Sequence, residues 1–250
     1  MAFIYRSLMQ RMIVPTFSLR HLGDRCLSLD FGDTILAETG LICLAAAEKI
    51  RVAQLSGVTD VIPSYTSVAV HYQAEPQTGL PNFRTLSDAL TALIQAGVSP
   101  AERALRTIDI PVCYGGEHGP DLAEVAKITG LSEQEVIQMH CAPGSMVFML
   151  GFAPGHPYIG IHDPLFALPR RDVPRTVVPA GSVAIANRQS TIYPTRLPGG
   201  WHILGATPLK LFDLARPQPT LLLPGDHIRF VPISSAEFDR LAAQQSQVIA

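Results

Sequence analysis

The chain has little charge, few cysteines and no long apolar run, and each shortage excludes a class of protein. Only 16% of its 250 residues are charged, and the formal net charge is -2. Without a basic excess, nothing in the composition favours binding to nucleic acid or to an acidic membrane surface. No apolar stretch approaches the roughly 20 residues that a membrane span needs. We therefore expect a globular protein that binds neither nucleic acid nor a membrane.

The cysteines and histidines are too scattered for a metal centre or a disulfide framework. No two cysteines form a Cys-x-x-Cys pair, and the eight histidines show no ligand spacing. We expect no structural metal, and reduced thiols in a cytoplasmic protein. The four cysteines are Cys26, Cys43, Cys113 and Cys141.

Residues 1–16 resemble no targeting segment. They carry Arg6 and Arg11, and they lack both an uninterrupted apolar run and a small-residue cleavage site. We expect an N-terminal extension there, with Met12 as an alternative start.

Several common catalytic motifs are also absent. The sequence contains no Gly-x-x-x-x-Gly-Lys phosphate loop, no Gly-x-Gly-x-x-Gly fingerprint, no Gly-x-Ser-x-Gly elbow and no His-Glu-x-x-His helix. The residues alone therefore do not specify a reaction.

The periodicity of residues 17–100 predicts a small α+β domain. Segment 17–31 has the alternation of a strand pair or one bent strand, and an apolar stripe at three-four spacing predicts a helix over 41–55. A second β segment over 58–72 and a second helix over 86–97 follow. The order predicts helices on one face of a small antiparallel sheet.

We predict a second, mainly β domain over residues 107–250, after a linker over 97–106. A strand at 108–114 opens it, and two short helices follow, at 122–130 and up to about His140, the second with a capping box. This pair has the rhythm of a helix-turn-helix, but its second helix has two glutamates and no lysine or arginine, so we do not expect DNA binding.

Proline dominates the rest of this domain, because 13 of the 21 prolines fall between residues 154 and 232. Short apolar runs between turns are typical of a small barrel or sandwich. A closing helix is expected over 234–244. The runs are 147–150, 183–185, 203–204, 209–212, 221–223 and 227–231.

The stretch 151–201 is rich in glycine, proline, arginine and aromatic residues, as loops that line a ligand often are. Arg170, Arg171 and Arg175 fall within six positions, between prolines. Guanidinium groups bind carboxylates and phosphates through paired hydrogen bonds, which favours an anionic ligand. The alternative is a solvated edge on which Asp172 and backbone carbonyls neutralise these charges.

Two predicted strands, 181–186 and 189–193, are joined at Asn187-Arg188. In the second strand, Ser190 and Ile192 share one face, and polar side chains share the other. Gln189, Thr191 and Tyr193 share one face, which lines either a pocket or a wet outer surface. Trp201, the single tryptophan, follows Gly199 and Gly200 and is either a core residue or a wall of the site.

Three further side chains in loops are candidates for contact with a ligand. His156 and Tyr158 flank Pro157, and His118 precedes Gly119-Pro120. A histidine in a loop is more often a surface residue than a catalyst.

A series of motifs resembles the allophanate hydrolase subunit 1 family, which includes the kinase inhibitor KipI. The match extends from residue 17 to residue 233. The motifs are Tyr-Gly-Gly-Glu-His-Gly-Pro-Asp-Leu (114–122), Gly-Leu-Ser (130–132), His140, Gly-Phe-Ala-Pro-Gly (151–155), Pro-Arg (169–170), Pro-Arg (174–175), Val-Pro-Ala-Gly-Ser-Val (178–183), Ile-Tyr-Pro (192–194), Pro-Gly-Gly-Trp (198–201) and Thr-Pro (207–208).

The resemblance implies a cyclophilin-like barrel after the α+β domain. It also implies a role as the B component of an ATP-dependent 5-oxoprolinase, which opens 5-oxo-L-proline to L-glutamate together with subunits A and C. ATP would be a co-substrate at a site shared with those partners. The alternatives are a KipI-like inhibitor of a sensor histidine kinase and a component of the urea carboxylase or allophanate hydrolase pathway.

For a lactam substrate, Arg170 and Arg175 would stabilise developing negative charge or hold the substrate carboxylate, with His118 as a third catalytic candidate. The sequence departs from the family pattern at His156, Ile161-His162, Asn187-Arg188, Thr191 and Leu197. The candidate substrate-binding residues are His156, Tyr158, Gln189, Thr191, Tyr193, Gly199, Gly200 and Trp201.

Overall fold

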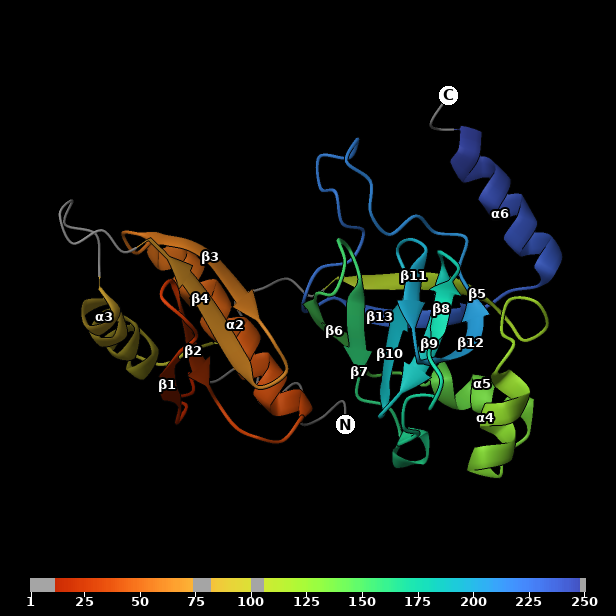
Figure 1. The fold of residues 1–250 in the computed structure, drawn as a ribbon, viewed down its shortest axis with the longest axis horizontal. Helices are drawn as coiled ribbons and strands as arrows, with labels where there is room; N and C mark the ends of the chain where they lie inside the picture. The colour runs from red at the N-terminus through yellow and green to blue at the C-terminus, as the bar shows by residue number, and fades with distance from the viewer. Residues whose placement is uncertain (1–11, 74–81, 100–105, 248–250) are drawn as a thin grey trace. The chain divides into compact units, whose positions relative to one another are not determined.

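The computed structural model describes residues 12–73, 82–99 and 106–247 (Figure 1). The chain forms two compact units, residues 1–104 and 105–250. Of the extension and linker expected from the sequence, positions 1–11 and 100–105 lie outside the described residues.

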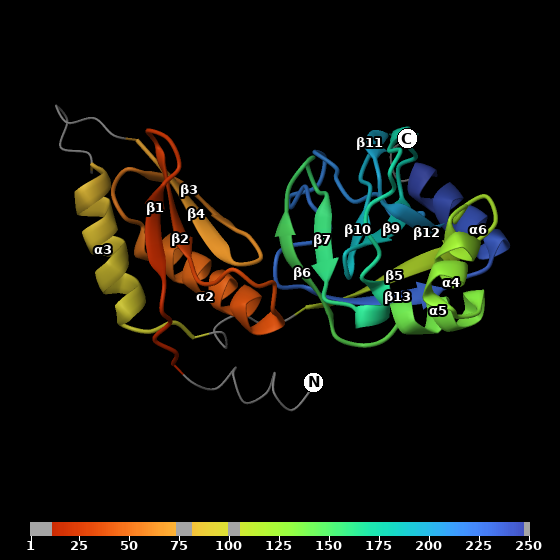
Figure 2. The same ribbon diagram turned by 60° about the horizontal axis from the view of Figure 1, so that its bottom comes forward.

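In its described residues, the first unit holds an antiparallel four-stranded sheet in the order β1-β2-β4-β3, together with two helices (Figures 1 and 2). The segment 17–31 is a strand pair, and the helices begin and end within a few residues of the predicted bounds. The elements are β1 (Ser18–His21), β2 (Cys26–Asp30), α2 (Ala37–Ala53), β3 (Val58–Pro63), β4 (Ser67–Tyr72) and α3 (Phe83–Gln95).

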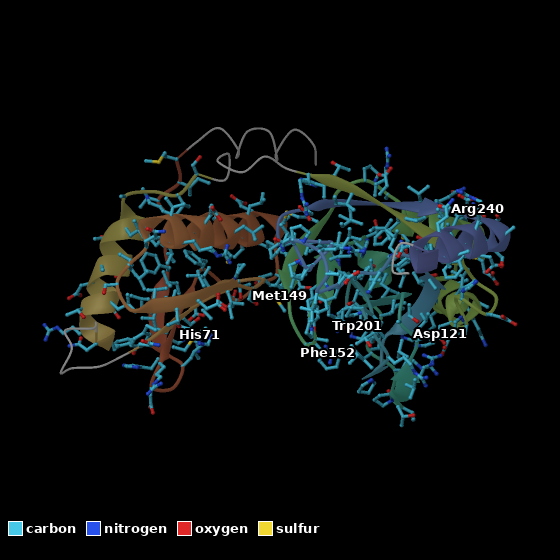
Figure 3. The ribbon with its side chains drawn as sticks, turned by 90° about the horizontal axis from the view of Figure 1, so that it is seen from above. His71, Asp121, Met149, Phe152, Trp201 and Arg240 are labelled. Atoms are coloured by element: carbon cyan, nitrogen blue, oxygen red, sulfur yellow. The ribbon has the colours of Figure 1, made fainter. Side chains whose placement is uncertain are left out.

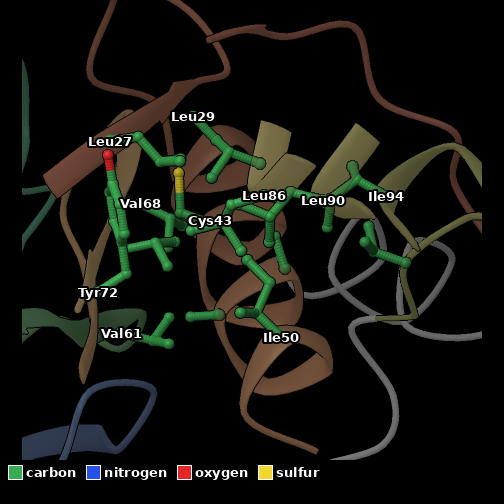
Figure 4. Close-up of a cluster of buried hydrophobic side chains, with 14 residues drawn as sticks. Leu27, Leu29, Cys43, Ile50, Val61, Val68, Tyr72, Leu86, Leu90 and Ile94 are labelled. Carbon is green, nitrogen blue, oxygen red and sulfur yellow. The ribbon is translucent and has the colours of Figure 1, made fainter. Parts of the chain in front are cut away.

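One face of this sheet packs against both helices (Figure 4). Alternate strand residues such as Leu27, Leu29 and Val68 point into the core, where they meet Cys43 of α2 and Leu90 of α3. Burial of this apolar surface is the main source of stability for the unit.

The second unit is built on a closed barrel with the strand order β10-β7-β6-β13-β5-β12-β9. Its strands β5 and β13 are parallel, and the other neighbours are antiparallel. Of the barrel or sandwich that the proline-punctuated runs predicted, the structure has the barrel. The strands are β5 (Thr107–Tyr114), β6 (Ser145–Leu150), β7 (Pro157–Gly160), β9 (Ser182–Ala186), β10 (Gln189–Ile192), β12 (His202–Ala206) and β13 (His227–Pro232).

Helices and a short sheet surround the barrel. In α5, Ser132 and Glu135 form the capping box that the sequence predicted, and the closing helix is α6. The two-stranded sheet pairs β8 with β11. The elements are α4 (Leu122–Thr129), α5 (Glu133–His140), the 3-10 turn η2 (Pro164–Phe166), β8 (Arg175–Val178), β11 (Leu197–Gly199) and α6 (Ser235–Gln247).

Two of the apolar runs noted in the sequence are not strands of the barrel. Runs 209–212 and 221–223 form no named strand, and only an isolated bridge joins Phe212 to Thr220. These runs are apolar for another reason, because Leu211 and Leu222 are buried in the barrel core as loop residues. Apolar runs show burial more reliably than they show strand geometry.

Candidate functional site

A small pocket lies among the loops and strand ends of the second unit. Its volume is about 100 Å³, below the range of about 300–1,000 Å³ typical of drug-sized ligands, so it suits a small molecule. Most of the residues predicted to bind substrate line it. Of the lining residues, Figure 3 labels Trp201, which was predicted, and Phe152, which was not. The lining residues are Phe152, His156, Tyr158, Arg170, Tyr193, Pro198, Gly199, Gly200 and Trp201.

Arg170 supplies the positive charge of the pocket. Its guanidinium carbon lies 5.7 Å from the centre of the Trp201 ring, a cation–π arrangement. Among the ion pairs of the described residues, none involves Arg170. Trp201 is 6% exposed and serves both expected roles, because it packs in a core cluster and also forms a wall of the pocket.

His156 is a neutral group at this site. Its burial lowers the pKa to about 4, so the ring is uncharged at neutral pH. Thr191 donates its hydroxyl hydrogen to the carbonyl of Pro157 at 2.8 Å, and its oxygen lies 3.1 Å from His156 Nε2. Because that hydrogen is already used, the imidazole is the donor to Thr191. Thr191 is thus a buried support behind His156 and does not line the pocket.

Two tyrosines add neutral hydroxyl groups. Burial raises the pKa of Tyr193 to about 12, an effect that nearby Tyr158 increases and Arg170 partly offsets. Burial also raises the pKa of Tyr158. A Cβ atom on Gly199 would lie 2.1 Å from the Tyr193 hydroxyl oxygen, so glycine is required beside this ring.

Arg175 and Arg171 lie outside the pocket and pair with Asp121, a residue that the sequence analysis did not single out. Asp121 Oδ1 accepts hydrogen bonds from Arg175 Nη2 at 2.6 Å and from Arg171 Nη1 at 3.1 Å. Arg171 also binds Glu124 at 2.7 Å. Burial alone would raise the pKa of Asp121, but the hydrogen bonds from Arg175 and the Ile203 amide, with both arginine charges, lower it.

Two other candidates also lie away from the pocket lining. The His118 ring packs against Phe238 of α6, with 4.2 Å between the ring centres. Gln189 begins β10 opposite Gly160 and Ala186, next to the hairpin turn. Neither His118 nor Gln189 lines the pocket that contains Arg170.

The opposite face of β10 carries a buried polar network inside the barrel. Ser190 Oγ lies 2.8 Å from His140 Nε2 and 2.7 Å from His162 Nε2, and Tyr114 Oη lies 2.7 Å from His140 Nδ1. Burial lowers the pKa of His140 well below its usual value and that of His162 to about 4. One feature of the sequence pointed to this network: Ser190 is a polar residue on the strand face that it shares with the apolar Ile192.

Neither a metal centre nor a membrane helix emerges from the described ranges. Within residues 12–73, 82–99 and 106–247, no three His, Cys, Asp or Glu side chains are grouped so that they could hold a metal ion. Of the helices in these ranges, none combines the length and hydropathy that a membrane crossing needs.

Comparisons with known proteins support the resemblance read from the motifs. The B component of 5-oxoprolinase from Bacillus subtilis is 40% identical over 228 residues, which cover 89% of this chain and 95% of that protein. The same component from Escherichia coli O157:H7 is 38% identical, over 83% of this chain and 95% of that protein. The crystal structure of TTHA0988 superimposes with a TM-score of 0.72 at 37% identity, over 84% of this chain and 40% of that one.

The family model described as "Carboxyltransferase domain, subdomain C and D" matches residues 17–222. This range includes most of both units and every residue that lines the pocket. The chain therefore belongs to the carboxyltransferase domain, subdomain C and D, family.

Proposed function

We propose that this chain is the B component of an ATP-dependent 5-oxoprolinase complex, which opens 5-oxo-L-proline to L-glutamate with ATP hydrolysis. The two bacterial relatives that carry this name, matched over 95% of their length, support the assignment. The observation that carries it within the molecule is the small pocket in which Arg170 lies over Trp201. We further propose that the closed barrel is of the cyclophilin-like type.

The pocket matches the chemistry of 5-oxo-L-proline. The substrate is a small ring with one carboxylate and one neutral lactam. Arg170 would bind the carboxylate, and the faces of Trp201 and Phe152 would contact the ring. The hydroxyl groups of Tyr158 and Tyr193 are neutral donors for the lactam oxygen.

The chain would bind and orient the substrate, while partner subunits would supply the remaining groups. A lactam is a stable amide, and phosphorylation of its oxygen by ATP would make the carbon electrophilic enough for water. His156, with a pKa near 4, is a poor general base at neutral pH. We therefore assign ATP as a co-substrate and place the missing base with subunits A and C. The four free cysteines support a cytoplasmic location for the complex.

The test is reconstitution. The chain is purified alone, with each partner separately, and with subunits A and C together, and both ATP hydrolysis and glutamate formation are followed with 5-oxoproline. Glutamate formed only by the full set is the expected result. An assembled complex that hydrolyses ATP with urea and not with 5-oxoproline would instead assign the chain to a urea pathway. Inhibition of a sensor kinase by the chain alone would support the KipI-like alternative.

A further inference from the structure

Asp121 is a buried carboxylate that joins the two segments forming the charged wall of the pocket. It is 3% exposed, and Figure 3 labels it in the second unit. Its Oδ2 accepts a hydrogen bond from the amide of Ile203 at 2.7 Å, two residues after Trp201. Its Oδ1 holds Arg171 and Arg175, on either side of the turn that follows Arg170. One side chain thus connects β12 with segment 169–175.

The loop before Asp121 is shaped to bring it there. The Gly115 amide donates to the carbonyl of Leu204 at 3.0 Å, and the Asp121 amide donates to the carbonyl of Ile203 at 3.1 Å. A Cβ atom on Gly119 would lie 2.0 Å from the Leu204 oxygen, so only glycine allows this approach. The Gly-Gly-Glu-His-Gly-Pro-Asp motif therefore forms a support for β12.

Backbone hydrogen bonds of the two neighbouring residues, Pro169 and Arg171, fix the position of Arg170. His202 Nε2 donates to the carbonyl of Pro169 at 3.0 Å, and the Arg171 amide donates to the carbonyl of Gly200 at 2.7 Å. Arg170 lies between these two backbone anchors, and the side-chain bonds to Asp121 close the turn behind it. Because Asp121 pairs with both Arg171 and Arg175, and Glu124 pairs with Arg171 as well, Arg170 is the one of these three arginines left to meet an anion.

We infer that Asp121 is a positioning residue, which holds Arg170 over Trp201 and keeps the two neighbouring arginines away from the ligand. Its carboxylate acts on the pocket wall through segment 169–175 and the Ile203 amide. Its role is thus to fix the distance between the cation and the ring, and to leave one guanidinium of the three for the ligand.

Trp201 provides a readout that needs no catalysis, because it is the single tryptophan of the chain. We would measure acrylamide quenching of Trp201 fluorescence in the full-length wild-type protein and in the full-length Asp121→Asn variant. Release of segment 169–175 is expected to raise the quenching constant at least twofold. Arg171→Gln, which leaves Asp121 paired with Arg175, is a milder second variant and is expected to raise the constant by a smaller factor.

Asp226→Asn is the matched control. Asp226 is also buried, pairs with Arg106 and accepts the Leu223 amide, and none of these residues lines the pocket. The inference would be supported if Asp226→Asn lost as much thermal stability as Asp121→Asn but left the quenching of Trp201 unchanged. Quenching in Asp121→Asn and Arg171→Gln that matches the wild type, or rises equally in Asp226→Asn, would overturn it.

A second readout rests on the proposed function. In the assembled complex, Asp121→Asn is expected to raise the KM for 5-oxoproline at least tenfold, with a smaller change in kcat, and Asp121→Glu is expected to restore part of the loss. A wild-type complex without 5-oxoproline turnover would refute the proposed function, while the quenching result would still decide the role of Asp121.

Discussion

At the scale of single residues, three arginines that look equivalent in the sequence have different surroundings. Arg170 lies over the Trp201 ring, whereas Arg171 and Arg175 bind a carboxylate about fifty positions earlier in the chain. Sequence spacing predicted an anion-binding segment, but it could not show which of the three guanidinium groups is left for a ligand. That depends on Asp121, which reads in the sequence as an ordinary residue at the start of a helix.

Arg170→Gln tests this distinction. Hydrogen bonds to charged groups contribute roughly 1.5–3 kcal/mol, so we expect the KM for 5-oxoproline to rise roughly 10- to 100-fold in the assembled complex. Steady-state kinetics would measure it. Arg196→Gln, at an exposed arginine of the same unit that does not line the pocket, is the control. Equal KM values for the two variants would remove Arg170 from the site.

Gly199 tests the packing of the pocket. An alanine Cβ there would lie 2.1 Å from the Tyr193 hydroxyl oxygen and 2.8 Å from Cζ, and the ring, 2% exposed, has little room to move. We expect Gly199→Ala to weaken 5-oxoproline binding at least tenfold in a Trp201 fluorescence titration. Gly151→Ala, whose added Cβ would make only ordinary contacts at 3.9 Å, should bind like the wild type. Unchanged binding in Gly199→Ala would show that the Tyr193 ring can shift.

At the scale of elements, the hairpin β9–β10 shows what the sequence could predict. Its turn at Asn187-Arg188 was expected, and both residues have positive φ, 49° and 64°, as a two-residue hairpin turn requires. Period-two alternation also separated Thr191 from Ser190 correctly. It could not show what each face meets, because His156, His140 and His162 reach β10 from other parts of the chain. His156 and Thr191, two departures from the family pattern, are direct partners.

The inward face of β10 should matter for stability and not for binding. Ser190→Ala would leave both Nε2 atoms of the buried histidines without their shared partner, so we expect a loss of about 2 kcal/mol in the free energy of unfolding. Chemical denaturation would measure this loss, and Trp201 quenching should stay unchanged. Thr176→Ala, at an exposed strand position in the same unit, should cost less than about 0.5 kcal/mol. Equal losses in Ser190→Ala and Thr176→Ala would mean that the buried network adds nothing to the free energy of unfolding.

At the scale of the whole molecule, the second unit buries three histidines in their neutral form. Burial lowers the pKa of His140, His156 and His162, and the last two reach about 4. In the unfolded chain these groups titrate near 6.5. Between pH 6.5 and 4 the unfolded state therefore binds more protons than the folded state. The stability that these residues provide is complete above pH 6.5 and is lost as the pH falls towards 4.

We therefore expect the free energy of unfolding of this unit to be flat above about pH 7 and to fall steeply below about pH 6. A shift from 6.5 to about 4 corresponds to roughly 3 kcal/mol for each of His156 and His162. Urea denaturation at several pH values, followed by Trp201 fluorescence, measures the slope. His162→Asn removes one titrating group. The free energy of unfolding of this variant should therefore depend less on pH than that of the wild type, whatever the stability of the variant at neutral pH. The same slope in both proteins would contradict the assignment, because a histidine that is neutral when folded and charged when unfolded must contribute to it.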